Sequence, residues 1–366
     1  MKKILVVGQT PPPFGGAAMM IHRTLIGEYG ANIKLYHVRL NFSKRMSDVG
    51  KFQISKLFHI FIIIIKIIFS RFKYRIETLY YFPAGPKIIP IFRDVLILGF
   101  TRNLFKNTIF HFRGAGLSKY LRKLPKPFSS LLLHFYYKPE ISIRLSKHTP
   151  DDSSYIKAKN NFIVLNGIED KSLEYERNLI TNKAIDLLFI GVLKESKGVS
   201  ILLQVCSILS KSRIDFHCNI IGEFESKGYK TKCLSYIKKQ NINGNISFHG
   251  IKLDTEKFIF LNNCDLFVFP TFFESEGTPG VIIEAMSFSK PIVSTNWSGV
   301  PSLVEHGYNG LLSPVKDTES IFKNILFLIQ NPDQRVIFGT NSRKKYLKEF
   351  ELSRYHKNMK EIFERI

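Results

Sequence analysis

Two glutamates eight positions apart, Glu276 and Glu284, are the side chains in this sequence best placed to do chemistry. They stand on either side of a Gly-Thr-Pro-Gly turn at positions 277–280. The apolar run before them, 265–270, is typical of a short buried strand, and a helical pattern begins at Val281. The sequence therefore predicts a strand, a loop and a helix, with both carboxylates at the end of the unit where ligands bind.

The start of a helix offers free backbone N–H groups and a partial positive charge, which suit an anionic ligand such as a diphosphate. Glu276, on the loop, would reach one part of that ligand. Glu284, about one helical turn in, would accept hydrogen bonds from hydroxyl groups of another part, as carboxylates do with sugars and riboses. The spacing also fits two ordinary solvated acids, with Glu284 favoured by the helix dipole.

The stretch from Glu276 to Glu284 resembles the E-x7-E motif of retaining glycosyltransferases with the GT-B fold, family 4 (glycosyl transferases group 1) in particular. Residues 189–198 resemble the phosphate-clasping strand and loop of that family. Further segments match in the same order: 164–167, 220–222, 248–250, 291–295 and 299–312. The resemblance covers most of residues 160–320, whereas the first half matches chiefly through Gly15 and Gly16.

The resemblance implies a role for each residue of the motif. Glu276 would orient hydroxyls of the donor sugar, Glu284 would hold the nucleotide ribose, and Lys197 would neutralise the leaving diphosphate. It makes Glu276, Lys197 and His111 the catalytic candidates. The donor-binding candidates are Gly16, Lys194, Lys197, Gly250, Glu276, Gly277, Thr278, Pro279, Gly280, Val281 and Glu284.

Lys197 lies in a loop between a predicted strand, 185–190, and a helix. An ammonium group there would stabilise charge growing on a departing diphosphate, although the position also suits an ordinary solvated lysine at a helix start. The family commonly has Arg directly after the glycine that Gly191 matches, and this chain has Val192 instead. That departure weakens the expected pair of cations, and Lys194 is a candidate substitute.

In the first half, Gly15 and Gly16 follow the predicted strand 3–8 and precede a helix. Glycines let a backbone approach a phosphate closely, so both residues are acceptor-binding candidates, although turn glycines are common. His111 ends a strand before a glycine-rich turn, and similar enzymes often place a histidine there against the donor sugar; a lone histidine is more often structural. Arg113 is a further candidate for acceptor or phosphate contact.

Apolar runs alternate with helical patterns along the chain, which favours parallel α/β sheets, and 366 residues are enough for two domains. The predicted fold is α/β, GT-B, with two Rossmann-like parallel-sheet domains facing across a cleft. The expected strands are 3–8, 33–38, 76–82, 108–113, 140–146, 161–165, 185–190, 216–221, 245–249, 265–269 and 291–294. The resemblance implies an acceptor-binding domain at 1–166, a linker at 167–184, a nucleotide-sugar-binding domain at 185–345, and a C-terminal helix at 346–366 that crosses back to the N-terminal domain.

Positive charge gathers in the first half of the chain. Residues 1–150 hold 25 Lys and Arg against 5 Asp and Glu, a net +20, out of +23 for the whole chain. Such a charge attracts nucleic acid or anionic lipid. Because no zinc-finger spacing, RNA-recognition motif or helix-turn-helix pattern accompanies it, nucleic acid is not an expected partner and an anionic membrane surface is.

Residues 54–73 form an apolar run interrupted by Lys66, which is too short to span a bilayer. On a helix, its few polar residues fall on one narrow side and apolar residues cover the rest. The pattern predicts either a core helix over a sheet or a helix lying in a membrane surface.

The expected function is retaining transfer of a sugar from a nucleotide-sugar donor, with UDP- or GDP-sugars favoured, to a glycan or lipid-linked acceptor in bacterial surface polysaccharide biosynthesis. A GT-B nucleotide-sugar epimerase and a non-catalytic membrane-surface subunit are the alternatives. The four cysteines show no C-x-x-C spacing, which fits a reducing cytoplasm. The expected location is the inner face of the cytoplasmic membrane, and no metal or other cofactor is expected.

A chelator provides the first test, because the sequence shows no D-x-D placed like a metal site. If positioning and fixed charges suffice for transfer, EDTA should leave the rate of nucleotide release unchanged within about twofold. Strict dependence on added Mg²⁺ or Mn²⁺ in the same assay would contradict this scheme.

Overall fold

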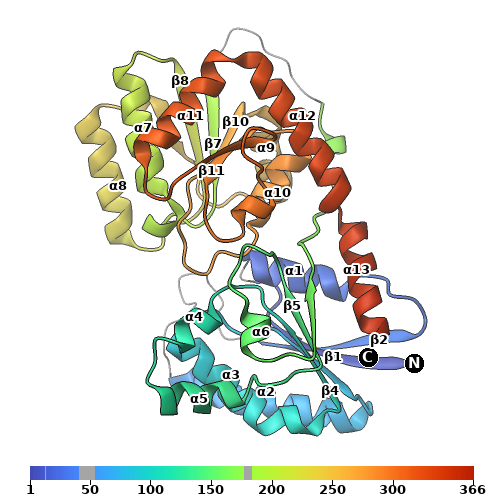
Figure 1. Ribbon diagram of the computed structural model, residues 1–366. Coiled ribbons are helices and arrows are strands. Elements are labelled where there is room, and N and C mark those ends of the chain that lie inside the picture. Colours follow the sequence, from blue (N-terminus) through green and yellow to red (C-terminus); the bar gives the residue numbers. More distant parts are fainter. Residues whose placement is uncertain (13, 41–53, 177–183) are drawn as a thin grey trace. The chain divides into compact units, whose positions relative to one another are not determined.

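The computed structural model describes residues 1–12, 14–40, 54–176 and 184–366. It divides into two compact units (Figure 1): unit 1 is Met1–Gly167 together with Leu352–Ile366, and unit 2 is Ile168–Glu351. Of the linker predicted at 167–184, residues 177–183 lie outside the described residues.

Unit 1 contains a six-stranded parallel sheet in the order β2-β1-β3-β4-β5-β6. In this sheet β2 lies on one side of β1 and β3 lies on the other, so the topological switch point is between β1 and β3. The bounds are β1 Lys2–Gly8, β2 Ile33–Arg39, β3 Thr78–Tyr81, β4 Asn107–His111, β5 Ile141–Arg144 and β6 Asn160–Ile163.

Helices cover both faces of the sheet in unit 1, because its strands are apolar on both sides. Leu5 and Val7 of β1 face a core shared with α2 (Ile54–Lys73), α3 (Ile88–Thr101), α4 (Leu117–Leu121) and α5 (Lys126–His134). Ile4 and Val6 face the opposite core, shared with α1 (Gly16–Leu25) and α13 (Leu352–Glu364). The short helix α6 (Asp152–Tyr155) lies between β5 and β6 in the chain.

The helix predicted at 54–73 is present as α2. Ile60, Ile63, Ile64 and Ile67 are buried in the unit-1 core, so one side of α2 is a core face. The opposite side is exposed. Within the described residues, none of the helices has the length and apolar character needed to cross a membrane.

Unit 2 contains a second six-stranded parallel sheet, in the order β12-β11-β10-β7-β8-β9. If the strands of unit 2 are numbered from 1 at β7, their order read from β9 is 3-2-1-4-5-6. This is the order of dinucleotide-binding Rossmann domains, and it places the switch point between β7 and β10. The bounds are β7 Ile185–Ile190, β8 Phe216–Ile221, β9 Ile246–Phe248, β10 Leu266–Phe269, β11 Ile292–Thr295 and β12 Gly310–Ser313. The two sheets confirm the predicted pair of Rossmann-like domains.

In unit 2 an α-helix follows each of the strands β7 to β10, whereas a loop joins β11 to β12 and two helices follow β12. The helices of this unit are α7 (Val199–Lys211), α8 (Lys227–Gln240), α9 (Asp254–Asn263), α10 (Gly280–Ser287), α11 (Thr318–Gln330) and α12 (Pro332–Glu349). The helix that matters most for the site is α10, since it begins directly after the turn that contains Glu276 and carries Glu284 in its second turn.

A buried acid holds the α3 side of unit 1 together. Asp94 has a fully buried side chain that accepts hydrogen bonds from the hydroxyls of Tyr81 (2.7 Å) and Tyr136 (3.1 Å) and from the backbone N–H of Ala84 (2.6 Å). The Arg93 guanidinium forms an ion pair with the Asp94 carboxylate at 2.8 Å. This carboxylate joins β3, α3 and the segment after α5.

Replacing Asp94 with Ala should lower the free energy of unfolding by about 3 kcal/mol, because two buried hydroxyls, one N–H and a guanidinium lose their acceptor. Urea unfolding followed by circular dichroism measures this. The matched control is Glu77→Ala, which removes an exposed acid from the same unit and should change stability by less than about 0.5 kcal/mol. Equal midpoints for the two variants would contradict the role given to Asp94.

Candidate active site at the strand ends of unit 2

The loops that follow β7 and β10 pack tightly against each other at the switch point of unit 2. The backbone N–H of Phe272 donates to the carbonyl of Ser196 at 2.8 Å. Gly198 has φ of +85°, and a Cβ atom there would lie 2.1 Å from the carbonyl oxygen of Pro270. Only glycine satisfies both the left-handed backbone and the close approach, so Gly198 sets the spacing of the two loops.

Glu276 is the acid on which these loops converge. Its carboxylate oxygen Oε2 accepts from the Lys197 ammonium at 2.6 Å and from the Thr271 hydroxyl at 2.7 Å. The side chains of Lys197 and Glu276 are 15% and 8% exposed, so this ion pair is largely shielded from water. Two strand-end loops therefore bring together one acid and one cation that are 79 positions apart in the sequence.

Aromatic rings surround the cations of this cluster. The Lys194 ammonium lies 3.6 Å from the ring centroid of Phe273, and the Lys197 ammonium lies 4.8 Å from the same ring and 5.3 Å from that of Phe269. Such contacts hold an ammonium group in place while leaving part of it accessible. Lys194 and Lys197 thus share one aromatic ring, whereas the side chain at Val192 carries no charge.

The loop that carries Glu276 is fastened to the loop that follows β11. Thr295 donates its hydroxyl to the carbonyl of Thr271, the Trp297 indole donates to the carbonyl of Phe273 at 2.8 Å, and the Ser298 hydroxyl donates to the carbonyl of Glu276 at 2.5 Å. These three bonds fix the backbone from the end of β10 as far as Glu276.

Glu284 is buried on α10 and is held on one side only. Its Oε1 accepts from the ammonium of Lys257, on α9, at 2.8 Å. Its Oε2 is a buried acceptor with no hydrogen-bond partner among the described residues. An unpaired buried carboxylate oxygen costs free energy unless a ligand donates to it, so Oε2 marks a position for a hydroxyl group.

The turn before α10 leads directly into the N-terminus of the helix, where the sequence predicts backbone donors for a ligand. Thr278 and Pro279 are buried, Pro279 caps the helix without a side-chain hydrogen bond, and Gly280 is its first residue. The first turn of the helix carries no acidic side chain that would compete for an anion. Gly250, another predicted donor residue, follows β9 at the edge of the sheet, where its carbonyl accepts from the N–H of Gly222 at 2.8 Å.

The predicted residues of unit 1 lie at the strand ends of its own sheet. Gly15 is the residue before α1, and Gly16 begins that helix with open space around the position of a Cβ atom. Arg113 donates to the Asn166 side chain at 2.8 Å and to the Tyr355 hydroxyl at 2.6 Å, so its guanidinium is engaged in the polar interior of unit 1. Contact of these residues with an acceptor stays a prediction.

His111 is fully buried at the end of β4. One ring nitrogen, Nδ1, shares a hydrogen bond with the Tyr80 hydroxyl at 2.6 Å, and the other, Nε2, has no partner among the described residues. Burial, and secondarily the nearby charge of Arg113, lower the pKa of His111 well below its ordinary value of 6.5. The ring is therefore neutral at pH 7.

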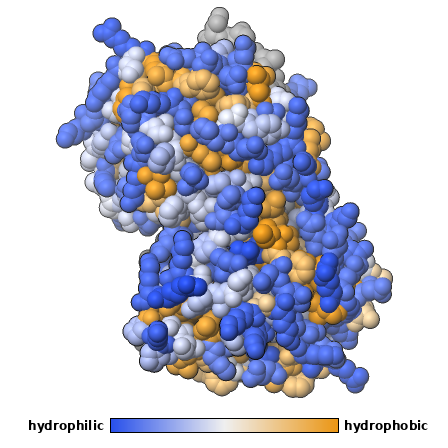
Figure 2. Space-filling view, viewed as in Figure 1, coloured by the Kyte–Doolittle hydropathy of each residue, from blue (hydrophilic) through white to orange (hydrophobic). Residues whose placement is uncertain are grey.

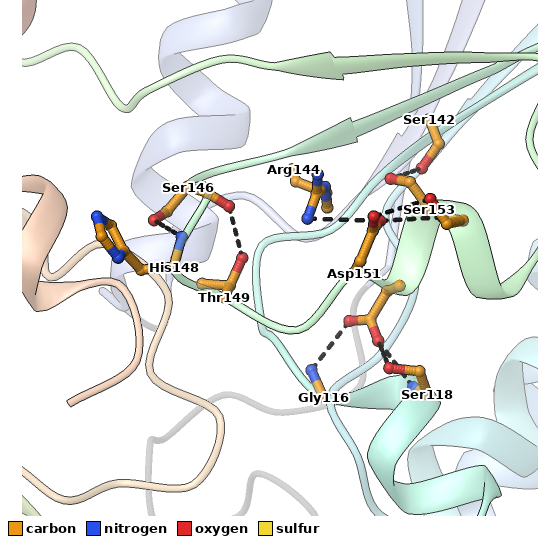
Figure 3. Close-up of polar contacts among 11 residues, drawn as sticks. Gly116, Ser118, Ser142, Arg144, Ser146, His148, Thr149, Asp151 and Ser153 are labelled. Carbon is orange, nitrogen blue, oxygen red and sulfur yellow. Dashed lines mark hydrogen bonds and ion pairs between the residues drawn. The ribbon is translucent and has the colours of Figure 1, made fainter.

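Figure 3 shows how the turn after His111 is held. Asp152 accepts from the backbone N–H groups of Gly116 (2.9 Å) and Ser118 (2.7 Å) and from the Ser118 hydroxyl. Ser142 and Ser153, also drawn there, share a hydrogen bond at 2.6 Å. The buried carboxylate of Asp152 thus fixes the glycine-rich turn that follows β4 to the start of α6.

Comparison with known proteins now adds to this geometry. Residues 170–345 match the family model described as Glycosyl transferases group 1. The match spans 176 residues, a little under half of the chain, and this part of the chain is similar to that family. The matched residues include the whole β7–β10–α10 cluster described above.

An uncharacterized glycosyltransferase of Methanocaldococcus jannaschii is 31% identical over 221 residues, which cover 58% of each chain. The capsular polysaccharide biosynthesis glycosyltransferase CapM of Staphylococcus aureus is 27% identical over 210 residues, or 54% of each chain. The matches therefore span a little over half the length of these relatives.

Among solved structures, HepE of Anabaena in complex with UDP covers all of both chains with a TM-score of 0.75 at 13% identity. The same protein has been solved with UDP-glucose, with a TM-score of 0.74. At this identity the likeness concerns the fold, and the fold is GT-B, as predicted.

Several residues of this candidate site escape sequence reasoning. Thr271 and Lys257 contact the two key glutamates, yet neither belongs to a motif with a recognisable spacing. The signal for Thr271 is its place directly after the Pro that ends the strand at 265–270. In the part of the chain that the structure describes, no group of three or more His, Cys, Asp or Glu side chains could hold a metal ion.

The buried histidine predicts a pH dependence of stability. The folded chain keeps His111 neutral, while the unfolded chain binds a proton below about pH 6.5, so stability is fully present above that pH and falls as the pH drops further. Between pH 6.5 and 5, the free energy of unfolding should fall less steeply in His111→Gln than in the unchanged protein, by up to about 1.4 kcal/mol per pH unit.

Urea unfolding at several pH values measures this slope. His134→Gln, which replaces an exposed histidine of α5, is the matched control and should keep the slope of the unchanged protein. A slope that stays the same in His111→Gln would mean that His111 accepts a proton in the folded state.

Proposed function

We propose that this protein is a retaining glycosyltransferase that moves a sugar from a nucleotide-sugar donor to an acceptor hydroxyl. The observation that carries the proposal is the buried Glu276–Lys197 pair at the switch point of unit 2, followed at once by the N-terminus of α10. Carboxylate, ammonium and helix N-terminus are the groups needed for a sugar and a diphosphate that lie next to each other.

Each part of the donor has a matching group in unit 2. In the proposed complex, Lys197 and the backbone N–H groups of Gly280 and Val281, at the start of α10, bind the diphosphate. Glu276 accepts hydrogen bonds from sugar hydroxyls through the oxygen that Lys197 and Thr271 leave free. The unpaired Oε2 of Glu284 accepts from the ribose, while Lys257 holds the carboxylate in place through Oε1.

The proposed chemistry needs no strong base from the protein. The bond between the anomeric carbon and the donor phosphate oxygen breaks, and a bond from that carbon to the acceptor oxygen forms on the same face. The departing phosphate oxygen takes the acceptor proton. The contribution of the protein is positioning, together with stabilisation of the negative charge on the diphosphate by Lys197.

We further propose that the donor is a UDP- or GDP-sugar and that the acceptor is a lipid-linked glycan in bacterial surface polysaccharide biosynthesis. Support for the nucleotide comes from HepE, whose solved complexes contain UDP and UDP-glucose. Support for the pathway comes from CapM, a capsular polysaccharide biosynthesis glycosyltransferase. A lipid-linked acceptor would place the enzyme at the inner face of the cytoplasmic membrane.

Nucleotide release from a panel of UDP-, GDP-, dTDP- and ADP-sugars, with and without an extract of lipid-linked acceptors, tests the proposal. Release from one donor should rise with acceptor and fall at least about 100-fold in Glu276→Ala. The matched control is Glu274→Ala, which removes an exposed acid two positions away on the same loop and should keep the rate within about twofold.

Three results would count against the proposal. Equal rates for the two variants would exclude Glu276 as a donor-binding residue. Product analysis that finds free sugar and no need for an acceptor would favour a nucleotide-sugar epimerase. No release from any donor, with the protein folded and acceptor present, would favour a non-catalytic role.

A further inference from the structure

The exposed side of α2 carries a continuous row of large apolar side chains. Their spacing of three or four residues places them on one stripe of the helix, opposite the buried isoleucines. All are more than half exposed, from 56% to 69%: Phe58, Phe61, Ile65, Phe69 and Phe72. The helix is thus apolar on both sides, although only one side packs against unit 1.

A second row lies beside the first. Helix α3 packs against α2 on the same face of the sheet, and it also exposes apolar side chains: Ile88, Ile89, Phe92 and Phe100. We call these nine residues together the α2–α3 face. Figure 2 shows apolar residues along the lower rim of unit 1, where Figure 1 places these helices. So many exposed large apolar side chains on two packed helices are uncommon on a protein surface and indicate a binding surface.

The charge around the α2–α3 face is almost entirely positive. Residues 54–138 hold 15 Lys and Arg but only two acids, Glu77 and Asp94, and Asp94 is buried. On α2 itself, the Lys73 ammonium lies 5.2 Å from the Phe69 ring centroid and the Arg71 guanidinium lies 5.7 Å from that of Phe72. Aromatic rings flanked by cations suit the boundary between acyl chains and anionic headgroups.

Next to this stripe, the structure has a cavity of about 340 Å³ between β2 and α2. Its polar lining is basic or neutral and includes His37, Arg39, His59, Lys66 and Ser70, while Phe69 of the stripe closes one side. Lys66 is exposed and forms no ion pair with an acid among the described residues. The cavity therefore places two cationic side chains, Arg39 and Lys66, at the edge of the apolar row, and their charge suits a phosphate group.

We propose that unit 1 docks on a bilayer containing anionic phospholipid through the α2–α3 face. The apolar side chains enter the region between headgroups and acyl chains, and Lys66, Arg71 and Lys73 contact lipid phosphates. The proposal deepens the proposed function, because it names the surface and the partner that would bring the protein to a lipid-linked acceptor. Charge complementarity favours a membrane over an uncharged protein partner or a second copy of this positively charged unit.

Co-sedimentation with vesicles tests the proposal on the full-length chain, without donor or acceptor. Vesicles of phosphatidylglycerol and phosphatidylethanolamine in equal parts should bind the protein at least tenfold more tightly than phosphatidylcholine vesicles. The triple variant Phe61→Gln/Ile65→Gln/Phe72→Gln should lose at least tenfold in affinity for the anionic vesicles. Lys66→Gln should lose about fivefold, and more salt should reduce this difference.

A matched control removes the same kind of side chain elsewhere. Ile251, Ile259 and Val336 are exposed apolar residues of unit 2, and replacing all three with Gln should leave vesicle binding unchanged. Because the α2 positions are exposed, the triple variant should keep the thermal midpoint of the unchanged protein. If the triple variant does not fold, the conservative substitution Phe61→Trp still tests whether this position enters the membrane. The fluorescence of this variant should shift to the blue with anionic vesicles.

Three results would overturn the proposal. The first is a loss of vesicle affinity in the unit 2 control equal to that of the triple variant. The others are equal binding to both kinds of vesicle and a Phe61→Trp spectrum that does not shift. Self-association lost in the triple variant, with no vesicle binding by the unchanged protein, would assign the face to a second copy of this chain. Failure here is separable from failure of the proposed function, since vesicle binding needs no donor and the release of nucleotide in solution needs no membrane.

Discussion

The ion pair between Glu276 and Lys197 is the interaction on which the site of unit 2 depends. A largely buried carboxylate needs a cation and hydrogen-bond donors to offset its loss of hydration, and Lys197 and Thr271 supply both. The two partners come from loops on opposite sides of the switch point, where a Rossmann sheet leaves room for a ligand. The pair therefore joins the two loops and at the same time places one positive and one negative group at the end of the sheet.

The two units differ in how they present charge. In unit 2 the functional charges are few and mostly paired: Glu276 with Lys197 and Glu284 with Lys257. In unit 1 the positive charge spreads over the surface, while its buried acids, Asp94 and Asp152, hold structure. The first arrangement suits recognition of one ligand in a fixed pose, and the second suits a broad negatively charged partner.

Most of the fold could be predicted from the sequence, because buried parallel strands are short apolar runs and the helices between them carry a clear periodicity. β12 and α9 were missed. β12 has only four residues, 310–313, and α9 buries only one of its ten residues, Leu261, so neither leaves a strong pattern. Glu276 and Lys197 could be selected from the sequence, but their contact could not, since it depends on strand order.

Sequence spacing also missed the residues that position others. In the sequence, Lys257 is indistinguishable from other charged helix residues. Its role depends on its hydrogen bond to Glu284, which lies on another helix. Asp152 reads as part of an ordinary polar loop, although it holds the turn after β4. Arg113, for which a ligand contact is predicted, also holds structure, because it donates to Asn166 and to the Tyr355 hydroxyl.

The tight packing of the loop that follows β11 has a consequence for how this sequence can change over time. A side chain at Gly299 would collide with the carbonyl oxygen of Gly277, 2.1 Å from its Cβ position, so this glycine is expected to resist substitution. Glu274 is exposed on the same loop and is free to vary. Because the backbone is held by Trp297 and Ser298, mutations at such exposed positions can alter what the loop touches without displacing Glu276. Substrate preference can therefore diverge among descendants of this chain while the reactive groups keep their places.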